Sequence, residues 1–349
     1  MKYSKVFINS IAYEKAPIVV TSEELEARVA PVYKKFHIPM GQLSAMTGIE
    51  ERRWWPENFN VSEGAAKAAQ KALDDSGANI NDIGAIIYTG VCREQHEPAT
   101  ACRVADILGA SRDTFIYDIS SACLGVMTGM IDVANRIELG QIKAGLVVSC
   151  ESARDIVDIM IQKMLDDPSM ENFSYSLATL TGGSGAVAVL LTDGSLDLST
   201  DRSHQLLGAS SKAAPEFNDL CHWGHKDLGN HLKQEYMRTD AVSLLQHGVD
   251  LARETWDQFL SEHEWTPEQV NKVICHQVGS ANRLKVLGAL NIPEYKEYPG
   301  FQLLGNMGSV ALPTTAALAH DNGFLKPRDN VGFLGIGSGL TCMMLGIKW

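Results

Sequence analysis

The sequence predicts an α/β fold in which helices pack in layers against β-sheets. Short runs rich in β-branched residues, such as IGAIIYTGV (83–91) and NVGFLGIG (330–337), alternate with longer segments of helical periodicity, such as SEGAAKAAQKALDDSG (62–77). Short buried strands that alternate with amphipathic helices are typical of layered α/β folds. In the last example Ser62 is the expected N-cap of the helix, and Gly77 lies just past its expected end.

The order of these segments repeats along the chain. Each half reads as a helix, a strand, a second helix, a strand-to-helix corner and a further strand. Ile87 and Ile274 are 187 positions apart, and the corners at Cys123 and Met307 keep nearly that offset. This period is too long for a solenoid and predicts one βαβ-rich unit used twice, with the two halves packed on each other. The alternative is a generic resemblance, because any two βαβ units look alike.

Three polar residues are divided between the two expected halves. Residues 1–200 hold Cys123, and residues 201–349 hold His276 and Asn306. The ends of strands and the turns that follow them build the sites of α/β folds, so a duplicated fold would bring these three residues to one pocket between the halves. The competing interpretations are a satisfied core histidine for His276 and a left-handed turn residue for Asn306.

The composition limits the function classes. The chain has 349 residues, of which 45% are hydrophobic, so it can bury a large core. A net charge of −12 argues against a nucleic-acid-binding surface, which needs clustered Lys and Arg. No apolar run approaches the ~20 residues of a membrane-spanning helix, and the opening MKYSKVFINSIAYEKAPIVV does not read as a signal peptide. We therefore expect no nucleic-acid partner and no integral membrane protein.

The cysteine content indicates a reducing compartment. Seven cysteines are present and none belongs to a CxxC pair, so we expect no disulfide framework and a cytoplasmic location. The stretch CHWGH (221–225) invites a metal interpretation, but a zinc site would need a fourth ligand at a recognisable spacing. GIGSGL (335–340) lacks the GxGxxG spacing of a dinucleotide site. We expect no metal and no cofactor.

Cys123 lies in YDISSACLGVMTGM (117–130), which opens like a strand and closes like a helix. A free cysteine has a pKa of ~8.5, and a helix N-terminus or a neighbouring His can lower that pKa below 7. Small neighbours such as Ser121 and Gly125 leave room for a substrate carbonyl. These features predict a nucleophile that forms an acyl thioester, with its own N–H able to bind an oxyanion. The alternative is a buried structural cysteine. That structural role is expected for Cys92, Cys102, Cys150, Cys275 and Cys342.

The motifs around these residues resemble those of thiolase-superfamily condensing enzymes of the ketoacyl synthase III type, over essentially the whole chain. The matching stretches are SSACLGVMTG (120–129), TGGSGAVAVLL (181–191), CHQVGSANR (275–283), LLGNMGSVALP (303–313) and LGIGSGL (334–340). The resemblance implies a five-layered α-β-α-β-α fold and a homodimer. It also implies a Cys–His–Asn active site, made of Cys123, His276 and Asn306, at the end of a pantetheine tunnel.

Within that family the chain looks closest to the OleA-type enzymes, which join two long-chain acyl-CoAs head to head. Those enzymes carry a glutamate in a run that matches GVCREQHEPATACR (90–103), where the residue is Glu97. The resemblance implies that this loop crosses the dimer, so that Glu97 removes an α-proton in the neighbour's pocket. A carboxylate in an apolar tunnel can have its pKa raised for that work. The alternative is a solvated loop carboxylate.

The resemblance also implies a reaction. Cys123 would take the first acyl group from CoA, and N–H groups of Cys123 and of the turn Ser338–Gly339 would hold the oxyanion. His276 and Asn306 would donate hydrogen bonds to the second thioester. A Claisen condensation without decarboxylation would then give a 2-alkyl-3-oxoacyl product or the β-keto acid released from it, as the first step of long-chain olefin or ketone synthesis. Such an acyltransferase needs no cofactor.

Three other functions stay open at this stage. The first is an ordinary β-ketoacyl-acyl-carrier-protein synthase III, in which decarboxylation of malonyl-carrier protein generates the carbanion during fatty acid synthesis. The second is a cysteine hydrolase that uses the same thiol with water as acceptor. The third is a lipid-binding protein without activity, which would not need the three polar residues.

Two further sets of residues are expected to contact substrate. Ordinary ketoacyl synthase III sequences have a basic residue after TGI, where this chain has a glutamate, and Arg52 and Arg53 are the expected substitutes at the tunnel mouth. Met160 and Met164 lie at helical spacing in an apparent insertion, residues 151–180. Because methionine fits irregular apolar surfaces, we expect them to line or cap an acyl channel, with ordinary core packing as the alternative.

Overall fold

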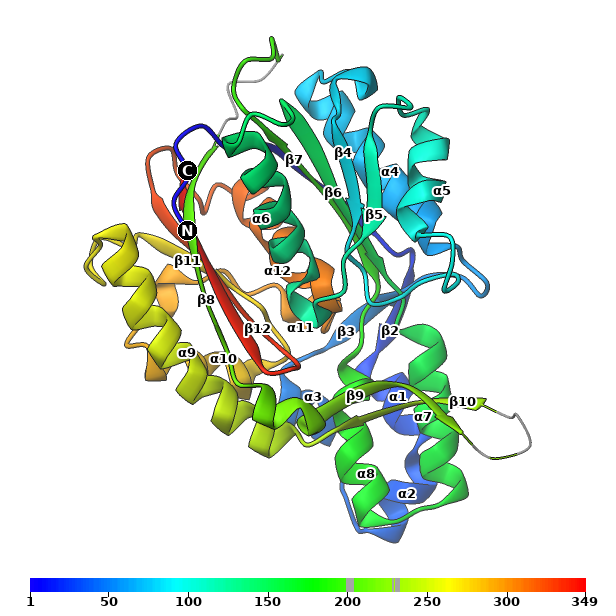
Figure 1. Cartoon of the computed structure of the whole chain (residues 1–349). Coiled ribbons are helices and arrows are strands. Elements are labelled where there is room, and N and C mark those ends of the chain that lie inside the picture. Colours follow the sequence, from blue (N-terminus) through cyan, green and yellow to red (C-terminus); the bar gives the residue numbers. More distant parts are fainter. Residues whose placement is uncertain (199–203, 228, 230–232) are drawn as a thin grey trace.

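The computed structural model describes residues 1–198, 204–227, 229 and 233–349. Two β-sheets face each other and are joined along one edge, with helices between them and on both outer faces (Figure 1). This arrangement is the five-layered α-β-α-β-α fold, which confirms the expected fold class. Within those ranges, no helix is both long and apolar enough to cross a membrane.

The two sheets are continuous through β1, which pairs with β7 along its length and with β8 only at Phe7 and Ile8. The order from edge to edge is β11 (Lys272–Cys275), β12 (Asn330–Gly337), β13 (Thr341–Lys348), β8 (His204–Ala213), β1 (Phe7–Lys15), β7 (Gly185–Thr192), β6 (Ala144–Glu151), β4 (Ala85–Tyr88) and β5 (Phe115–Asp118). β4 runs parallel to β5 and β6, and β11 runs parallel to β12. The other neighbours are antiparallel, so the sheet is mixed.

The helices form three layers around the two sheets (Figure 1). The central layer consists of α6 (Gly125–Glu138) and α12 (Ala311–Asp321). The two outer layers consist of α4 (Val61–Ser76) with α5 (Thr100–Leu108), and of α9 (Ala241–His263) with α10 (Ser280–Ala289). The buried side of α4 is mostly alanine, and small side chains let a helix lie close to the strands beneath it.

A smaller lobe of helices and two-stranded ribbons packs at one end of the layers (Figure 1). It contains α1 (Ser22–Arg28), α2 (Ala30–Lys35), α3 (Gln42–Thr47), α7 (Arg154–Asp166), α8 (Met170–Ser176), β2 (Ile18–Thr21), β3 (Glu51–Trp54), β9 (Cys221–Asp227) and β10 (Lys233–Thr239). The short elements are α11 (Phe301–Leu304), η1 (Ile80–Asp82), η2 (Ala122–Leu124), η3 (Leu177–Thr181), η4 (Pro215–Leu220), η5 (Glu294–Lys296) and η6 (Gly308–Val310).

The two halves of the chain repeat one strand order. From its outer edge inward, the part of the sheet built by the first half has the order β5, β4, β6, β7 and β1. The part built by the second half has, in the same order, a segment at Glu297, β11, β12, β13 and β8. Glu297 forms only an isolated bridge with Val273, so the counterpart of β5 is reduced to a single pairing. The expected boundary between residues 200 and 201 falls outside the described residues and stays a prediction.

Each half turns into its central helix through one 3-10 turn, η2 in the first half and η6 in the second. Ala122 (φ 45°) and Gly308 (φ 55°) adopt a left-handed backbone at matching positions of the two turns. The counterpart of Cys123 is therefore Ser309, and the predicted counterpart, Met307, is wrong. Ser309 is 186 residues from Cys123, close to the offset of 187 between β4 and β11, whereas Met307 is only 184 residues away and is the N-cap that precedes the turn.

Helix α4 begins differently from the prediction. Its N-cap is Asn60, and Ser62 lies inside the first turn. The N–H and the hydroxyl of Ser62 both donate to Oε1 of Glu94, at 2.8 and 2.6 Å, so a carboxylate from a distant loop satisfies this end of the helix. The predicted end is confirmed, because Gly77 (φ 72°) is the left-handed C-cap.

The tight packing of the first corner gives a stability prediction. A Cβ added at Gly125 would lie 2.1 Å from the carbonyl oxygen of Thr89, whereas a Cβ at Gly288 in α10 would meet nothing within 4 Å. We expect Gly125→Ala to lower the free energy of unfolding by about 3 kcal/mol or more, because the backbone must move. Gly288→Ala should be neutral or stabilising by up to ~1 kcal/mol. Urea denaturation of both variants checks this, and equal midpoints would contradict it.

Candidate active site

Cys123 lies in η2, between the end of β5 and the start of α6. The N–H of Leu124 donates to the carbonyl of Ser121 at 2.9 Å, which closes the turn around the thiol. The end of β12 packs on this turn, because a Cβ added at Gly337 would lie 3.6 Å from the backbone nitrogen of Cys123. The turn that follows Gly337 contains Ser338 and is therefore next to the corner. Its role as an oxyanion donor stays a prediction.

His276 follows β11 directly, and its N–H extends the pairing to β12 by donating to the carbonyl of Leu334 at 2.9 Å. The neighbouring Gly335 faces the cysteine corner, since a Cβ there would lie 2.4 Å from Cδ2 of Leu124. β12 therefore connects His276 to the turn that holds Cys123. Nδ1 of His276 is buried and has no hydrogen-bond partner among the described residues.

Asn306 lies between α11 and η6 and is held by three hydrogen bonds. Its N–H donates to the carbonyl of Thr181 at 2.8 Å, its carbonyl accepts from the N–H of Gly183 at 2.8 Å, and its Oδ1 accepts from the N–H of Gly308 at 3.1 Å. In the described part of the chain no hydrogen bond uses its Nδ2, so that amide N–H₂ can donate to a ligand. The left-handed backbone belongs to Gly305 (φ 66°) and Gly308, so Asn306 is not the left-handed residue of this turn.

The three residues come from elements that pack on one another. η2, which holds Cys123, contacts both β12 and η6. β12 is the strand beside His276, and η6 is the turn beside Asn306. The structure thus places the three predicted residues on adjoining elements at the junction of the two halves.

The resting site is electrically neutral at its nucleophile and its histidine. Burial raises the pKa of the Cys123 thiol to about 12, and the nearby Cys221 and Glu151 add to that rise. Burial also lowers the pKa of His276 to about 4. The predicted lowering of the thiol pKa is therefore wrong for the unliganded chain, because loss of solvent outweighs the helix N–H groups. The ground state therefore has a neutral thiol at Cys123 and a neutral imidazole at His276.

Glu97 is exposed on the loop between β4 and α5. The loop is fixed on both sides of it. Glu94 accepts from Ser62, and Asp118 accepts from the N–H groups of Thr100 and Ala101, each at 2.9 Å. Among residues with described positions, no hydrogen bond or ion pair connects Glu97 to another side chain. Its action in a neighbouring pocket stays a prediction.

The structure corrects the expectation for Arg52. Its side chain is fully buried, and its guanidinium donates to the carbonyl of Val20 at 3.3 Å and to the hydroxyl of Ser22 at 3.0 Å. Burial lowers the pKa of Arg52 to about 10. Within the lobe, this residue ties β3 to β2 and to the start of α1. Arg53 is partly exposed and pairs with Glu51 at 3.2 Å, and its place at a tunnel mouth stays a prediction.

Met160 and Met164 are both fully buried on α7. Met160 Sδ accepts from the N–H of Met237 on β10 at 3.4 Å, and Met164 belongs to the apolar core of the lobe. These contacts are the ordinary packing that was the alternative at the sequence level. A role in lining an acyl channel stays a prediction.

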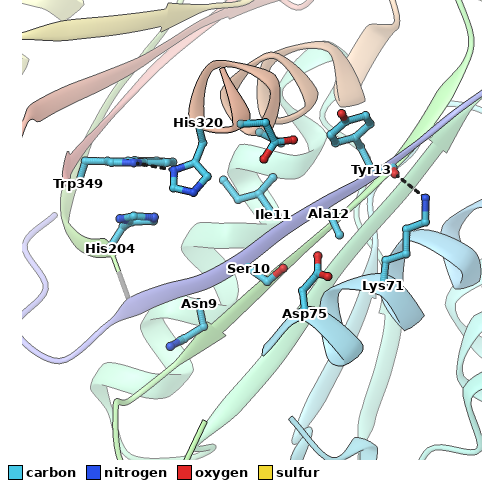
Figure 2. Close-up of a pocket in the computed structure, with 12 residues that line it drawn as sticks. Asn9, Ser10, Ile11, Ala12, Tyr13, Lys71, Asp75, His204, His320 and Trp349 are labelled. Carbon is cyan, nitrogen blue, oxygen red and sulfur yellow. Dashed lines mark hydrogen bonds between the residues drawn. The ribbon is translucent and has the colours of Figure 1, made fainter. Parts of the chain in front are cut away.

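A cavity of about 290 Å³ lies away from this site, beside β1 and between α4 and the end of α12 (Figure 2). It is lined by residues 9–13, by Lys71 and Asp75, and by His320 and Trp349. The indole Nε1 of Trp349 donates to Nδ1 of His320 at 3.1 Å. None of the predicted catalytic residues lines this cavity, so it takes no part in the predicted reaction.

Gln277 is a functional neighbour that the sequence analysis missed. It is buried beside His276, and its Oε1 accepts from the N–H groups of Gly300 and Phe301 at 2.8 and 3.1 Å. Its Nε2 donates to Glu297. Gln277 thus fixes the segment that leads into α11 and on to the asparagine turn. The available signal was a polar residue directly after the histidine of an apolar strand.

The CHWGH stretch forms the start of β9. His222 bonds Asp219 at 2.8 Å, and Cys221 lies near enough to Cys123 to affect its titration. In the ranges described, no group of three His, Cys, Asp or Glu side chains could hold a metal ion.

The five-layered α-β-α-β-α fold, with a cysteine corner on elements that adjoin those of a histidine and an asparagine, is that of condensing enzymes of the thiolase superfamily, of the ketoacyl synthase III type. Residues 260–349 match the family described as 3-oxoacyl-[acyl-carrier-protein (ACP)] synthase III C terminal. The acyl-CoA:acyl-CoA alkyltransferase of Shewanella oneidensis is 66% identical over all of both chains. The chain belongs to this family of acyl-CoA:acyl-CoA alkyltransferases, the OleA acyltransferases.

Solved structures and a more distant relative agree with this assignment. Cerulenin-bound Xanthomonas campestris OleA has a TM-score of 0.93 and 32% identity, covering 100% of this chain and 98% of that one. A variant of the same protein with bound lauric acid and lauroyl-CoA has a TM-score of 0.92 and 32% identity, covering 99% and 100%. β-Ketoacyl-[acyl-carrier-protein] synthase III 1 of Bacillus cereus is 27% identical over 87% of this chain and 88% of that protein.

The protonation of the resting thiol is testable by alkylation. Because burial raises the pKa of Cys123, its reaction with iodoacetamide should keep rising with pH above 9 in the free enzyme. Peptide mass mapping follows Cys123 and the exposed Cys102 in the same sample, so that Cys102 reports the behaviour of an accessible thiol. A plateau for Cys123 below pH 8 would show a stabilised thiolate and contradict the neutral ground state.

Proposed function

We propose that the protein joins two long-chain acyl-CoA molecules by a Claisen condensation that involves no decarboxylation. The observation that carries this proposal is a cysteine at a helix start, on elements that adjoin those of His276 and Asn306, in a chain 66% identical to an acyl-CoA:acyl-CoA alkyltransferase. The product is a 2-alkyl-3-oxoacyl thioester or the β-keto acid formed when that thioester is hydrolysed.

The first step transfers an acyl group to the enzyme. The sulfur of Cys123 attacks the thioester carbonyl, the bond from the carbonyl carbon to the CoA sulfur breaks, and the departing CoA takes the proton that Cys123 loses. The N–H of Cys123 and an N–H of the Ser338–Gly339 turn hold the tetrahedral oxyanion. Since the resting thiol is neutral, that proton leaves only when substrate occupies the site.

The second step forms the carbon–carbon bond. Glu97 of the partner subunit removes the α-proton of the second acyl-CoA, and His276 and Asn306 Nδ2 donate to the thioester oxygen as it becomes enolate-like. His276 with a pKa of about 4 is uncharged at neutral pH and donates through one ring nitrogen. The carbanion attacks the acyl group on Cys123, the thioester to Cys123 breaks, and its sulfur regains a proton.

A homodimer is part of the proposal because Glu97 then has a pocket to enter. Glu97 is exposed on a loop whose two ends are anchored, so the loop can project without unfolding. β5 is an edge strand and Phe115 on it is 52% exposed, which is the kind of edge that a second copy covers. All seven cysteines are free, which suits a cytoplasmic enzyme.

An ordinary β-ketoacyl-acyl-carrier-protein synthase III is the second candidate function. The match of residues 260–349 to the synthase III C-terminal family favours it. It uses the same Cys123, His276 and Asn306, but it has no need for Glu97, because loss of carbon dioxide generates its carbanion. The two functions therefore separate at this one carboxylate.

The decisive assay supplies lauroyl-CoA as the sole substrate. Wild-type protein should release CoA and form a product that carries both acyl chains, as seen by mass spectrometry. Cys123→Ala should abolish both CoA release and product. Glu97→Gln should keep the acyl-Cys123 adduct and lose about 100-fold or more in product formation, the usual effect of removing a general base. An adduct that turns over only with malonyl-carrier protein would sink the proposal in favour of synthase III.

Exchange of subunits tests whether Glu97 acts across the dimer. Cys123→Ala and Glu97→Gln are each inactive as homodimers, but a mixed dimer has one complete site if Glu97 enters the neighbour's pocket. Co-expression should then restore about one quarter of the wild-type rate, since about half of the dimers are mixed and each has one working site. No recovery, with mixed dimers confirmed by differential tagging, would place Glu97 in its own subunit's site.

A further inference from the structure

A buried carboxylate, Glu151, lies at the end of β6 and has no role in the steps above. It is 3% exposed and forms no ion pair within the described ranges. Its two oxygens accept four hydrogen bonds, and every partner is a donor. Four hydrogen bonds from backbone and hydroxyl donors hold this carboxyl group in one position.

Two of these bonds come from the loop that carries Glu97. The N–H of Val91 donates to Oε1 of Glu151 at 3.0 Å, and the N–H of Cys92 donates to Oε2 at 3.1 Å. Cys92 is also tied to the residue after Glu151, since the N–H of Ser152 donates to its sulfur at 3.3 Å. Glu151 therefore fixes the start of the loop a few residues before the predicted base.

The other two bonds come from the turn that follows Asn306. The hydroxyl and the N–H of Ser309 donate to Oε1 of Glu151, at 2.5 and 3.3 Å. Gly308 lies between Asn306 and Ser309 in the sequence, and a Cβ added there would lie 3.3 Å from Cδ of Glu151. The backbone of the asparagine turn thus packs against the same carboxyl group that binds the loop of Glu97.

The duplication of the fold explains why Glu151 can lie at the start of η6. Ser309 is the counterpart of Cys123, and η6 with α12 repeats η2 with α6. A helix N-terminus favours an anion. At the first corner that position faces the reacting carbonyl, whereas at the second corner Glu151 occupies it. The non-catalytic half of the duplicated site has become an anchor.

We propose that Glu151 is a positioning residue for the condensation step, which sets the Glu97 loop and the Asn306 turn relative to each other through one buried carboxylate. This inference rests on the proposed function, because Glu97 and Asn306 have their roles only there. Acylation of Cys123 needs neither the loop nor the asparagine amide. Glu151 also contributes to the raised pKa of Cys123, so loss of its charge should not slow acylation, whereas the second step should be harmed.

Glu151→Gln tests this, since it keeps the shape but replaces one acceptor oxygen with an N–H₂ group that faces N–H donors. With lauroyl-CoA we expect kcat for condensation to fall at least tenfold, KM to change less than threefold, and the burst of CoA from acylation to keep its wild-type amplitude. Glu138→Gln is the matched control. Glu138 also accepts several bonds, from Ser4 and Lys5, but it lies far along α6 from the corner.

Amide hydrogen exchange tests the anchor without any reference to activity. In Glu151→Gln, exchange should speed up at residues 91–97 and at residues 305–309 together. Glu94→Gln frees the same loop from Ser62 but does not touch the asparagine turn, so it should affect residues 91–97 alone. These measurements stay informative even if wild-type protein fails to condense acyl-CoA, an outcome that would overturn the proposed function only.

Three results would overturn the inference. The first is a change in exchange confined to one of the two segments in Glu151→Gln. The second is a condensation kcat within threefold of wild type. The third is an acylation burst that falls in proportion to condensation while circular dichroism shows a folded protein, because that pattern would mark a general structural role.

Discussion

The close contact between two strand-to-helix corners at the centre of the molecule is the constraint on which the rest depends. η2 and η6 pack on each other at the starts of the central helices α6 and α12, and this is feasible only because the second residue after the nucleophile is a glycine. A Cβ at Gly125 would lie 2.1 Å from Thr89 and 3.3 Å from Cβ of Ser309. Since each corner begins a central helix, their contact fixes the distance between α6 and α12, and with it the spacing of the sheets on which Cys123 and His276 lie.

Burial at these packed corners also sets the protonation states of Cys123 and His276. Because solvent is excluded, the pKa of Cys123 is raised to about 12 and the pKa of His276 is lowered to about 4. A histidine that is neutral at working pH is a good hydrogen-bond donor and a weak base. It can stabilise an enolate oxygen, but removal of an α-proton needs another group. In the proposed reaction the carboxylate of Glu97, on an exposed loop, supplies that group.

Local signals in the sequence were enough to predict the layered fold. They also singled out Cys123, His276 and Asn306, each at a strand end or a turn, and the structure places these residues on adjoining elements. Signals that depend on tertiary contacts were not available. Arg52 looked like a surface residue, and only the packing of β3 against β2 and the start of α1 shows it buried. Ser62 looked like an N-cap, but the N-cap is Asn60, and Glu94, 32 residues from Ser62, accepts the hydrogen bonds of Ser62. The repeat was detected from strand spacing, but its second corner lies two residues beyond the predicted one.

Duplication leaves a fold with two equivalent helix N-termini, and the charge of an anion at one affects the other across a short distance. Glu151 occupies the second of them, where its oxygens accept hydrogen bonds from Ser309 and from the loop that carries Glu97. In the proposed reaction the first corner then offers its N–H groups to new negative charge on a substrate oxygen. In that proposal, the difference between Cys123 and Ser309 decides which of the two corners reacts.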